Sequence, residues 1–179
     1  MKITFFWITW TGTSTVWKLL AKKLNYRFMS GGDLMRSWWR DLGLDICAFD
    51  DKIVKNDKDF DIKLDKKTKD FGEKNDDFVF EWRLARYFIP NSFKIFLKCE
   101  EEERYKRIEE REQLKRKWIK IEDIKLRNKK REKELILRYN KNYPNITFSP
   151  KEQDFDLVID TTKIWPGEIV DVIMNSIFK

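Results

Sequence analysis

The chain has 179 residues, of which 41% are hydrophobic and 39% are charged, a composition that suits one compact domain with a densely charged surface. It contains no histidine and only two cysteines, Cys47 and Cys99, which excludes a histidine-based nucleophile and leaves no zinc-ligand spacing. No run of about 18 apolar residues is present, so the sequence predicts no membrane span and a reducing, cytoplasmic setting. A net charge of +7 favours anionic partners, although the basic residues alternate with 31 acidic ones and also suit an ordinary solvated surface.

The pattern of apolar residues predicts strands that alternate with helices. Residues 1–6 form a short apolar run typical of a buried strand. A helix at 13–24, a strand at 26–30 and a helix at 34–42 follow. The rest of the chain predicts a charged helical segment at 45–75, strands at 78–81 and 93–99, charged helices over 100–142, a strand at 155–160 and a helix at 166–178. This alternation indicates an α/β fold, a three-layer sandwich with a central parallel sheet flanked by helices.

A candidate phosphate-binding loop lies between the first strand and the first helix. Such loops follow the pattern Gly, four residues, Gly, Lys, Ser/Thr, and their backbone N–H groups surround the phosphates at a helix N-terminus. If Gly12 is the second glycine, Trp7 takes the place of the first, Thr13 that of the lysine, and Ser14 that of the hydroxyl that ligates Mg²⁺. By itself a Ser/Thr run after Gly12 also suits a simple helix cap, and indoles in the loop would fill space that phosphates need.

Several motifs, in one order along the chain, resemble the archaeal-type cytidylate kinases, a branch of the P-loop nucleoside monophosphate kinases. The loop of that family, G-P-P-G-S-G-T-S-T, corresponds to W-I-T-W-T-G-T-S-T at residues 7–15. Its S-x-G-D-hydrophobic-x-R segment corresponds to residues 30–36, and its E-G-R-L-A to residues 81–85. The resemblance continues over nearly the whole chain, at I-P-N (89–91), at R-I-x-E-R-E (107–112), and at Arg131, Glu132, Arg138, Tyr139 and Tyr143.

The resemblance implies phosphoryl transfer from ATP to CMP, and with it dCMP, giving ADP and CDP or dCDP. It places Mg²⁺ near Ser14 and ATP on the loop formed by Trp7, Ile8, Thr9, Trp10, Thr11, Gly12, Thr13, Ser14 and Thr15. It assigns the acceptor nucleotide to Ser30, Asp33, Arg36 and Arg83. The arginines that would close on ATP and neutralise developing charge are Arg107, Arg111, Arg131 and Arg138.

The resemblance also implies a single domain over 1–179, with an acceptor-binding insertion at about 33–75 and a lid at about 107–142. Its partners would be small nucleotides, with no stable nucleic acid and no membrane, and the protein would act as a monomer. In related kinases the helix of the R-E…R-Y motif carries an acidic residue, whereas here Leu135 follows Glu134. The resemblance therefore leaves the contact to the pyrimidine base unassigned.

Other roles for the same residues stay open. Asp33 can simply cap its helix, the lid arginines can be solvated surface charges, and Glu81 can orient Mg²⁺ or pair with an arginine. Another nucleoside monophosphate kinase, such as an adenylate kinase, would share the S-G-G-D-x-x-R segment, although E-x-R-L-A and I-P-N favour cytidylate. A catalytically inactive nucleotide- or RNA-binding protein of the same fold is the alternative from a different class.

Tryptophan stands at three positions where the family has glycine: Trp7, Trp10 and Trp82. The chain has 8 tryptophans and 6 glycines, whereas an average glycine content of about 7% would correspond to roughly 12. Some bacterial lineages read the codon UGA as glycine, while other translation tables render it as tryptophan. The hypothesis that follows is that many of the eight tryptophans, these three among them, are glycines in the natural protein, and UGG codons at the three positions would exclude it.

Overall fold

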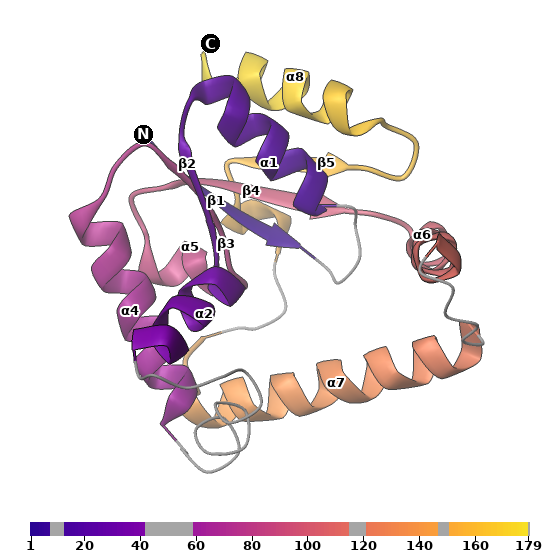
Figure 1. The fold of residues 1–179 in the computed structure, drawn as a ribbon, viewed down its shortest axis with the longest axis horizontal. Helices are drawn as coiled ribbons and strands as arrows, with labels where there is room; N and C mark the ends of the chain where they lie inside the picture. The colour runs from indigo at the N-terminus through magenta and orange to yellow at the C-terminus, as the bar shows by residue number, and fades with distance from the viewer. Residues whose placement is uncertain (8–12, 42–58, 115–120, 147–150, 179) are drawn as a thin grey trace. The chain divides into compact units, whose positions relative to one another are not determined.

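The computed structural model of the chain describes residues 1–7, 13–41, 59–114, 121–146 and 151–178, and over these residues five strands form one parallel sheet with helices flanking it (Figure 1). The strand order is β2-β3-β1-β4-β5. The strands are β1 (Lys2–Trp7), β2 (Arg27–Ser30), β3 (Phe78–Glu81), β4 (Phe93–Lys98) and β5 (Leu157–Asp160). The predicted α/β sandwich with a central parallel sheet is confirmed.

The helices follow the predicted order with shifted ends. They are α1 (Thr13–Leu24), α2 (Gly31–Asp41), α4 (Phe60–Lys74), α5 (Ala85–Phe88), α6 (Glu101–Leu114), α7 (Ile121–Asn142) and α8 (Pro166–Ile177), with a short 3₁₀ helix at Glu152–Asp154. The predicted helix at 13–24 is confirmed at both ends. The part of the predicted segment 45–75 before residue 59 lies outside the described residues, as does 115–120 between α6 and α7.

The packing divides the chain into two compact units, 1–6 with 17–95 and 7–16 with 96–179. In the first unit β3 pairs in parallel with both β1 and β2, and Phe78 and Phe80 are fully buried. Ala85 and Ile89 complete this cluster, with partly buried residues packed around it: Met29, Leu34, Phe71 and Trp82. Full burial of phenylalanines on a sheet with neighbours on both sides is the expected source of stability for this unit.

Helix α1 packs in the same unit through a tryptophan. Trp17 is 0% exposed, and its ring contacts Phe5 edge-on at a centroid distance of 5.4 Å and stacks on Phe28 at 6.4 Å. Val16 and Leu20 lie on the buried side of the helix, whereas Leu19 is 41% exposed. A buried aromatic ring of this kind contributes a large share of the packing energy.

The second unit has its own apolar clusters. Tyr105 and Ile108 of α6 pack with Ile124 of α7, and Phe96 of β4 packs against Phe155 at 5.1 Å between ring centroids.

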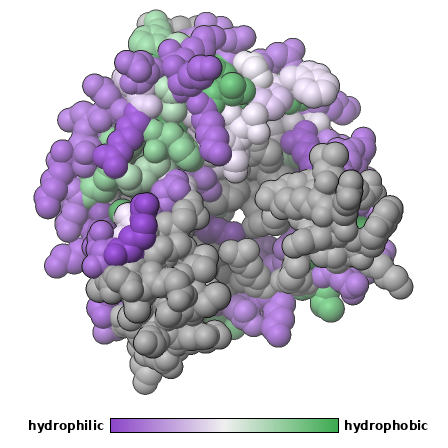
Figure 2. Space-filling view, viewed as in Figure 1, coloured by the Kyte–Doolittle hydropathy of each residue, from purple (hydrophilic) through white to green (hydrophobic). Residues whose placement is uncertain are grey.

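The molecular face in Figure 2 is mostly hydrophilic over the described residues, in agreement with the charged composition. Among those residues no helix combines the length and the apolar character needed to cross a bilayer.

Candidate active site

The carboxyl ends of β2 and β3 bring two family motifs together. In the parallel register Ser30 lies beside Glu81, so the last residues of the two strands are neighbours. Arg83 follows β3 by two residues. Ligands of open parallel sheets bind outside the carboxyl ends of the strands, so these residues lie at the edge where a substrate is expected. The structure thus brings the predicted acceptor residues Ser30 and Arg83 to the same edge of the sheet.

Ser30 and Asp33 bind each other at the start of α2. The Ser30 hydroxyl accepts a hydrogen bond from the Asp33 backbone N–H at 3.0 Å, and the Asp33 carboxylate accepts from the Ser30 backbone N–H at 3.1 Å and from its hydroxyl at 2.7 Å. This reciprocal arrangement is a capping box, and it explains why α2 begins at Gly31 rather than at 34. Asp33 therefore caps its helix, and the partial positive charge of the helix N-terminus lies at the same edge of the sheet as Glu81.

Trp82 fills the space between this helix start and α4. Its Nε1–H donates a hydrogen bond to Oδ1 of Asp65 at 2.9 Å, and Asp65 is 1% exposed. Its ring lies so close to Gly31 that a Cβ atom added there would come within 1.8 Å of Cε3 of the indole. The contact requires glycine at position 31 as long as residue 82 is tryptophan. The spacing of 17 residues between Asp65 and Trp82 gives no signal in the sequence.

Arg86 is a second residue that the sequence analysis did not identify. It is 6% exposed, and its guanidinium lies 5.0 Å from the ring centroid of Phe6 and 4.5 Å from that of Tyr87. The guanidinium also donates to the Tyr87 hydroxyl at 3.1 Å and to the Arg83 carbonyl at 3.5 Å. Buried arginines are rare unless paired, and no local pattern distinguishes this one from a surface arginine. It places a second positive charge directly after β3.

The predicted ATP loop is described only at its two ends. Trp7 ends β1 and Thr13 begins α1, while Ile8, Thr9, Trp10, Thr11 and Gly12 lie outside the described residues, as do the side chains of Trp7 and Thr13. Ser14 and Thr15 are exposed in the first turn of α1. An exposed hydroxyl there fits the Mg²⁺-ligating role expected of Ser14. In the described part of the chain no group of three or more acidic or cysteine side chains could hold a metal.

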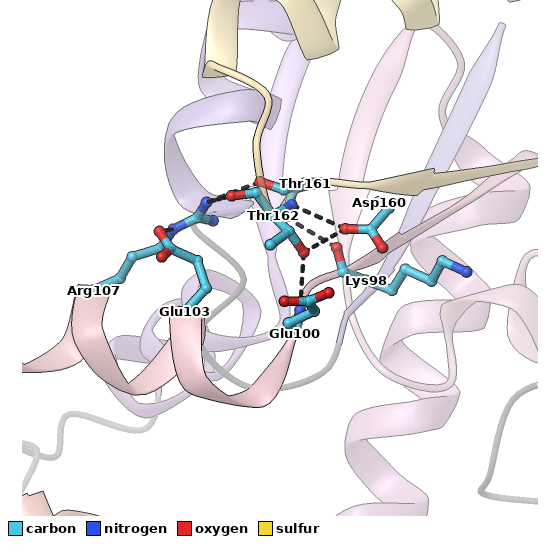
Figure 3. A network of polar contacts seen from close by, with 7 residues as sticks. All are labelled: Lys98, Glu100, Glu103, Arg107, Asp160, Thr161 and Thr162. Carbon is cyan, nitrogen blue, oxygen red and sulfur yellow. Dashed lines mark hydrogen bonds and ion pairs between the residues drawn. The ribbon is translucent and has the colours of Figure 1, made fainter.

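Of the four predicted lid arginines, Arg107 has a described side chain, and it is engaged within the second unit (Figure 3). Its Nε donates to Glu103 at 3.0 Å, and one terminal nitrogen donates to the carbonyl oxygens of Thr161 at 2.8 Å and Thr162 at 3.2 Å. Arg107 thereby ties α6 to the turn that follows β5. Arg111 lies in α6 and Arg131 and Arg138 in α7, and Arg36 lies in α2, but their side chains are outside the described residues.

The same turn is held by hydrogen bonds to β4. Thr161 donates from its backbone N–H and its hydroxyl to the Lys98 carbonyl at 2.8 and 3.0 Å. Thr162 donates to Asp160 from its N–H at 2.9 Å and from its hydroxyl, and accepts from the Glu100 N–H at 3.0 Å. The hydrogen bonds from the Thr162 side chain, and then from its backbone, hold the pKa of Asp160 below its ordinary value. The turn after β5 is therefore joined by hydrogen bonds to the end of β4 and to α6.

A solved shikimate kinase from Aquifex aeolicus covers 99% of this chain and 96% of its own at a TM-score of 0.59 and 22% identity, a likeness of fold. The fold is that of the P-loop kinases. A family model described as an AAA domain matches residues 9–141.

Two archaeal relatives match along the whole chain. The cytidylate kinase of Methanocorpusculum labreanum is 32% identical over 100% of this chain and 99% of its own length. That of Methanosarcina acetivorans is 31% identical over 99% of this chain and 96% of its own. The chain belongs to the archaeal-type cytidylate kinase family, and the resemblance stated from its motifs is confirmed.

Proposed function

We propose that the protein transfers the terminal phosphoryl group of ATP to CMP and dCMP, giving ADP and CDP or dCDP. The observation that carries the proposal is the meeting of Ser30, Glu81 and Arg83 at one edge of the sheet, in a chain whose full-length relatives are named cytidylate kinases. The homologues support an ATP-dependent kinase acting on nucleotides, and the choice of CMP is the finer part of the proposal.

The residues at this edge suit a nucleoside monophosphate. Arg83 would bind the acceptor phosphate through a charge-assisted hydrogen bond, and the N-terminus of α2, capped by Ser30 and Asp33, would add partial positive charge. Arg86, whose guanidinium donates to the Arg83 carbonyl at 3.5 Å, would add a second positive charge after β3. Phosphoryl transfer depends on positioning and charge neutralisation, so the lack of histidine in the sequence is no obstacle.

The donor side of the proposal assigns ATP to residues 7–15. Backbone N–H groups of the loop and the N-terminus of α1 would surround its phosphates, with Mg²⁺ near Ser14 neutralising charge on the transferred group. Arg111, Arg131 and Arg138 would close over ATP. Arg107 would hold the turn at 161–162 in place through its hydrogen bonds to the two carbonyl oxygens.

A coupled assay with CMP, dCMP, UMP and AMP tests the proposal. Two proteins should be compared, the chain as written and the variant Trp7→Gly/Trp10→Gly/Trp82→Gly, because indoles in the phosphate loop would obstruct ATP. We expect CMP and dCMP to be phosphorylated faster than UMP and AMP by at least one of the two proteins. If neither protein phosphorylates CMP, the proposal is wrong, and the inactive-binder alternative gains support.

Arg83 can be tested against a matched arginine of the same unit. Arg83→Gln should lower kcat/KM for CMP by roughly 100-fold, the scale expected when a charged hydrogen bond to phosphate is lost. Arg27 begins β2, at the opposite end of the strand, where it lies 5.6 Å from the centroid of the Phe71 ring. Arg27→Gln should leave kcat/KM within about twofold. Equal losses in the two variants would show that Arg83 has no special role.

A further inference from the structure

We propose that the indole of Trp82 lies where the acceptor base would lie in a glycine form of the site, and that Asp65 reads the hydrogen-bond donors of that base. The inference rests on the proposed function, because it assigns the base-binding part of the same site. The motif around Glu134 leaves the contact to the pyrimidine unassigned, and the structure offers a candidate for it elsewhere in the chain.

The position of the ring supports this assignment. Trp82 lies in the chain directly between Glu81, which pairs with Ser30, and Arg83. Its ring packs on Gly31, the first residue of the helix that Ser30 caps. In a nucleoside monophosphate only the ribose separates the base from the phosphate. A planar ring held next to the residues assigned to the phosphate therefore occupies space within reach of the base.

The chemistry of the contact also matches a nucleobase. The indole presents a flat aromatic face and one N–H, which Asp65 accepts at 2.9 Å. An ionised carboxylate only accepts hydrogen bonds, and the amino group of cytosine is a donor, whereas a keto oxygen at that position is an acceptor. With a uracil base the buried carboxylate, 1% exposed, would face an acceptor. Sites that bind a polar group of the substrate in this way discriminate strongly against an analogue that lacks it.

Asp65 would accordingly separate amino bases from keto bases. Cytosine and adenine both carry an amino donor, so this contact favours CMP over UMP and does not by itself distinguish CMP from AMP. In the chain as written the indole satisfies Asp65 and competes with the base for the same space. Replacement of Trp82 by glycine removes the ring and its N–H, and a carboxylate, which can accept several hydrogen bonds, can then accept one from the base.

Calorimetric titration of CMP and UMP into three proteins tests the inference. We expect the Trp82→Gly variant to bind CMP at least about tenfold more tightly than the parent protein does. The same variant should bind CMP at least about tenfold more tightly than it binds UMP. Adding Asp65→Asn to Trp82→Gly should bring the CMP/UMP affinity ratio to about one or below, because an amide can donate to a keto oxygen. Asp61 provides the matched control, since it is a neighbouring buried carboxylate of α4, 4% exposed. Asp61→Asn in the same background should leave the ratio unchanged.

Three outcomes would overturn the inference: no gain of CMP binding in Trp82→Gly, a ratio that Asp65→Asn does not change, or an equal change in Asp61→Asn. Circular dichroism and urea titration establish that each variant is folded, and Trp82→Ala carries the same test if the glycine variant unfolds. CMP binding that depends on Asp65 without any phosphoryl transfer would support the inference and contradict the proposed kinase activity. CMP phosphorylation together with a CMP/UMP affinity ratio that Asp65→Asn does not change would support the kinase activity and contradict the inference.

Discussion

The substitution Trp17→Gly should strongly destabilise the fold. Trp17 is 0% exposed and packs between Phe5 of β1 and Phe28 of β2, so its removal leaves a cavity that the neighbouring rings cannot close. Truncation of a buried tryptophan to alanine costs about 3–5 kcal/mol, and glycine in a helix interior costs about 1 kcal/mol more than alanine. The expected loss is therefore about 4–6 kcal/mol, a large part of the 5–15 kcal/mol typical of a domain.

Urea unfolding followed by far-UV circular dichroism measures this loss. With a urea m-value of about 2 kcal/mol/M, the midpoint should fall by about 2–3 M, or the variant should be unfolded without denaturant. The same substitution at Trp165 is the control. Trp165 is 77% exposed at the N-cap of α8, its backbone N–H donates to Glu168 whatever the side chain, and glycine is well tolerated at an N-cap. Trp165→Gly should change the free energy of unfolding by less than about 0.5 kcal/mol.

A loss below about 1 kcal/mol in Trp17→Gly would refute the packing argument. It would also extend the hypothesis of misread glycine codons to position 17, for which the family motif gives no expectation. A large loss would instead mark Trp17 as a tryptophan that the fold requires, in contrast to Trp7, Trp10 and Trp82, where the family has glycine.

Three further changes test other parts of the structure. Ser30→Ala removes the hydroxyl that accepts from the Asp33 N–H, and urea titration should show a loss of about 1 kcal/mol; an unchanged stability would contradict the reciprocal cap. Arg107→Gln removes the hydrogen bonds to the carbonyl oxygens of Thr161 and Thr162, so amide hydrogen exchange in this turn should accelerate. An unchanged exchange rate would contradict the role of Arg107 in holding the turn. Because the pKa of Asp160 is lowered in the folded state, its carboxylate stabilises the protein above the ordinary Asp pKa of about 3.9, and this contribution is lost as the pH falls through the folded pKa. Asp160→Asn should accordingly lower Tm at pH 7 by an amount that shrinks at more acidic pH, whereas a difference constant down to pH 2 would exclude the linkage.

Local patterns predicted the elements that depend on local sequence. The strand at 78–81 and the helix at 13–24 were predicted with the bounds that the structure has. The start of α2 was placed three residues late because the apolar pattern begins at Leu34, whereas the cap formed by Ser30 and Asp33 starts the helix at Gly31. Helix α5 was missed because its four residues are too few to show periodicity.

Features of the site that depend on distant contacts could not be predicted. Trp17 is buried because β1 and β2 each supply a ring, which the spacing within α1 does not reveal. The burial of Arg86 beside Phe6 and the bond between Trp82 and Asp65 likewise join segments distant in the chain. The motif residues Ser30 and Arg83 were identified by resemblance, and the parallel register explains why two residues 53 positions apart in the sequence lie at one edge of the sheet.

The close approach of Trp82 to Gly31 also restricts the order in which positions 31 and 82 can be substituted during evolution. A Cβ at position 31 would lie 1.8 Å from Cε3 of the indole, so any side chain at 31 is excluded while the tryptophan remains. A lineage that carries tryptophan at 82 must lose that ring before position 31 can vary, and a lineage with glycine at 82 is free to vary position 31 first. The two positions should therefore covary among relatives, with a bulky residue at 82 found only beside glycine at 31.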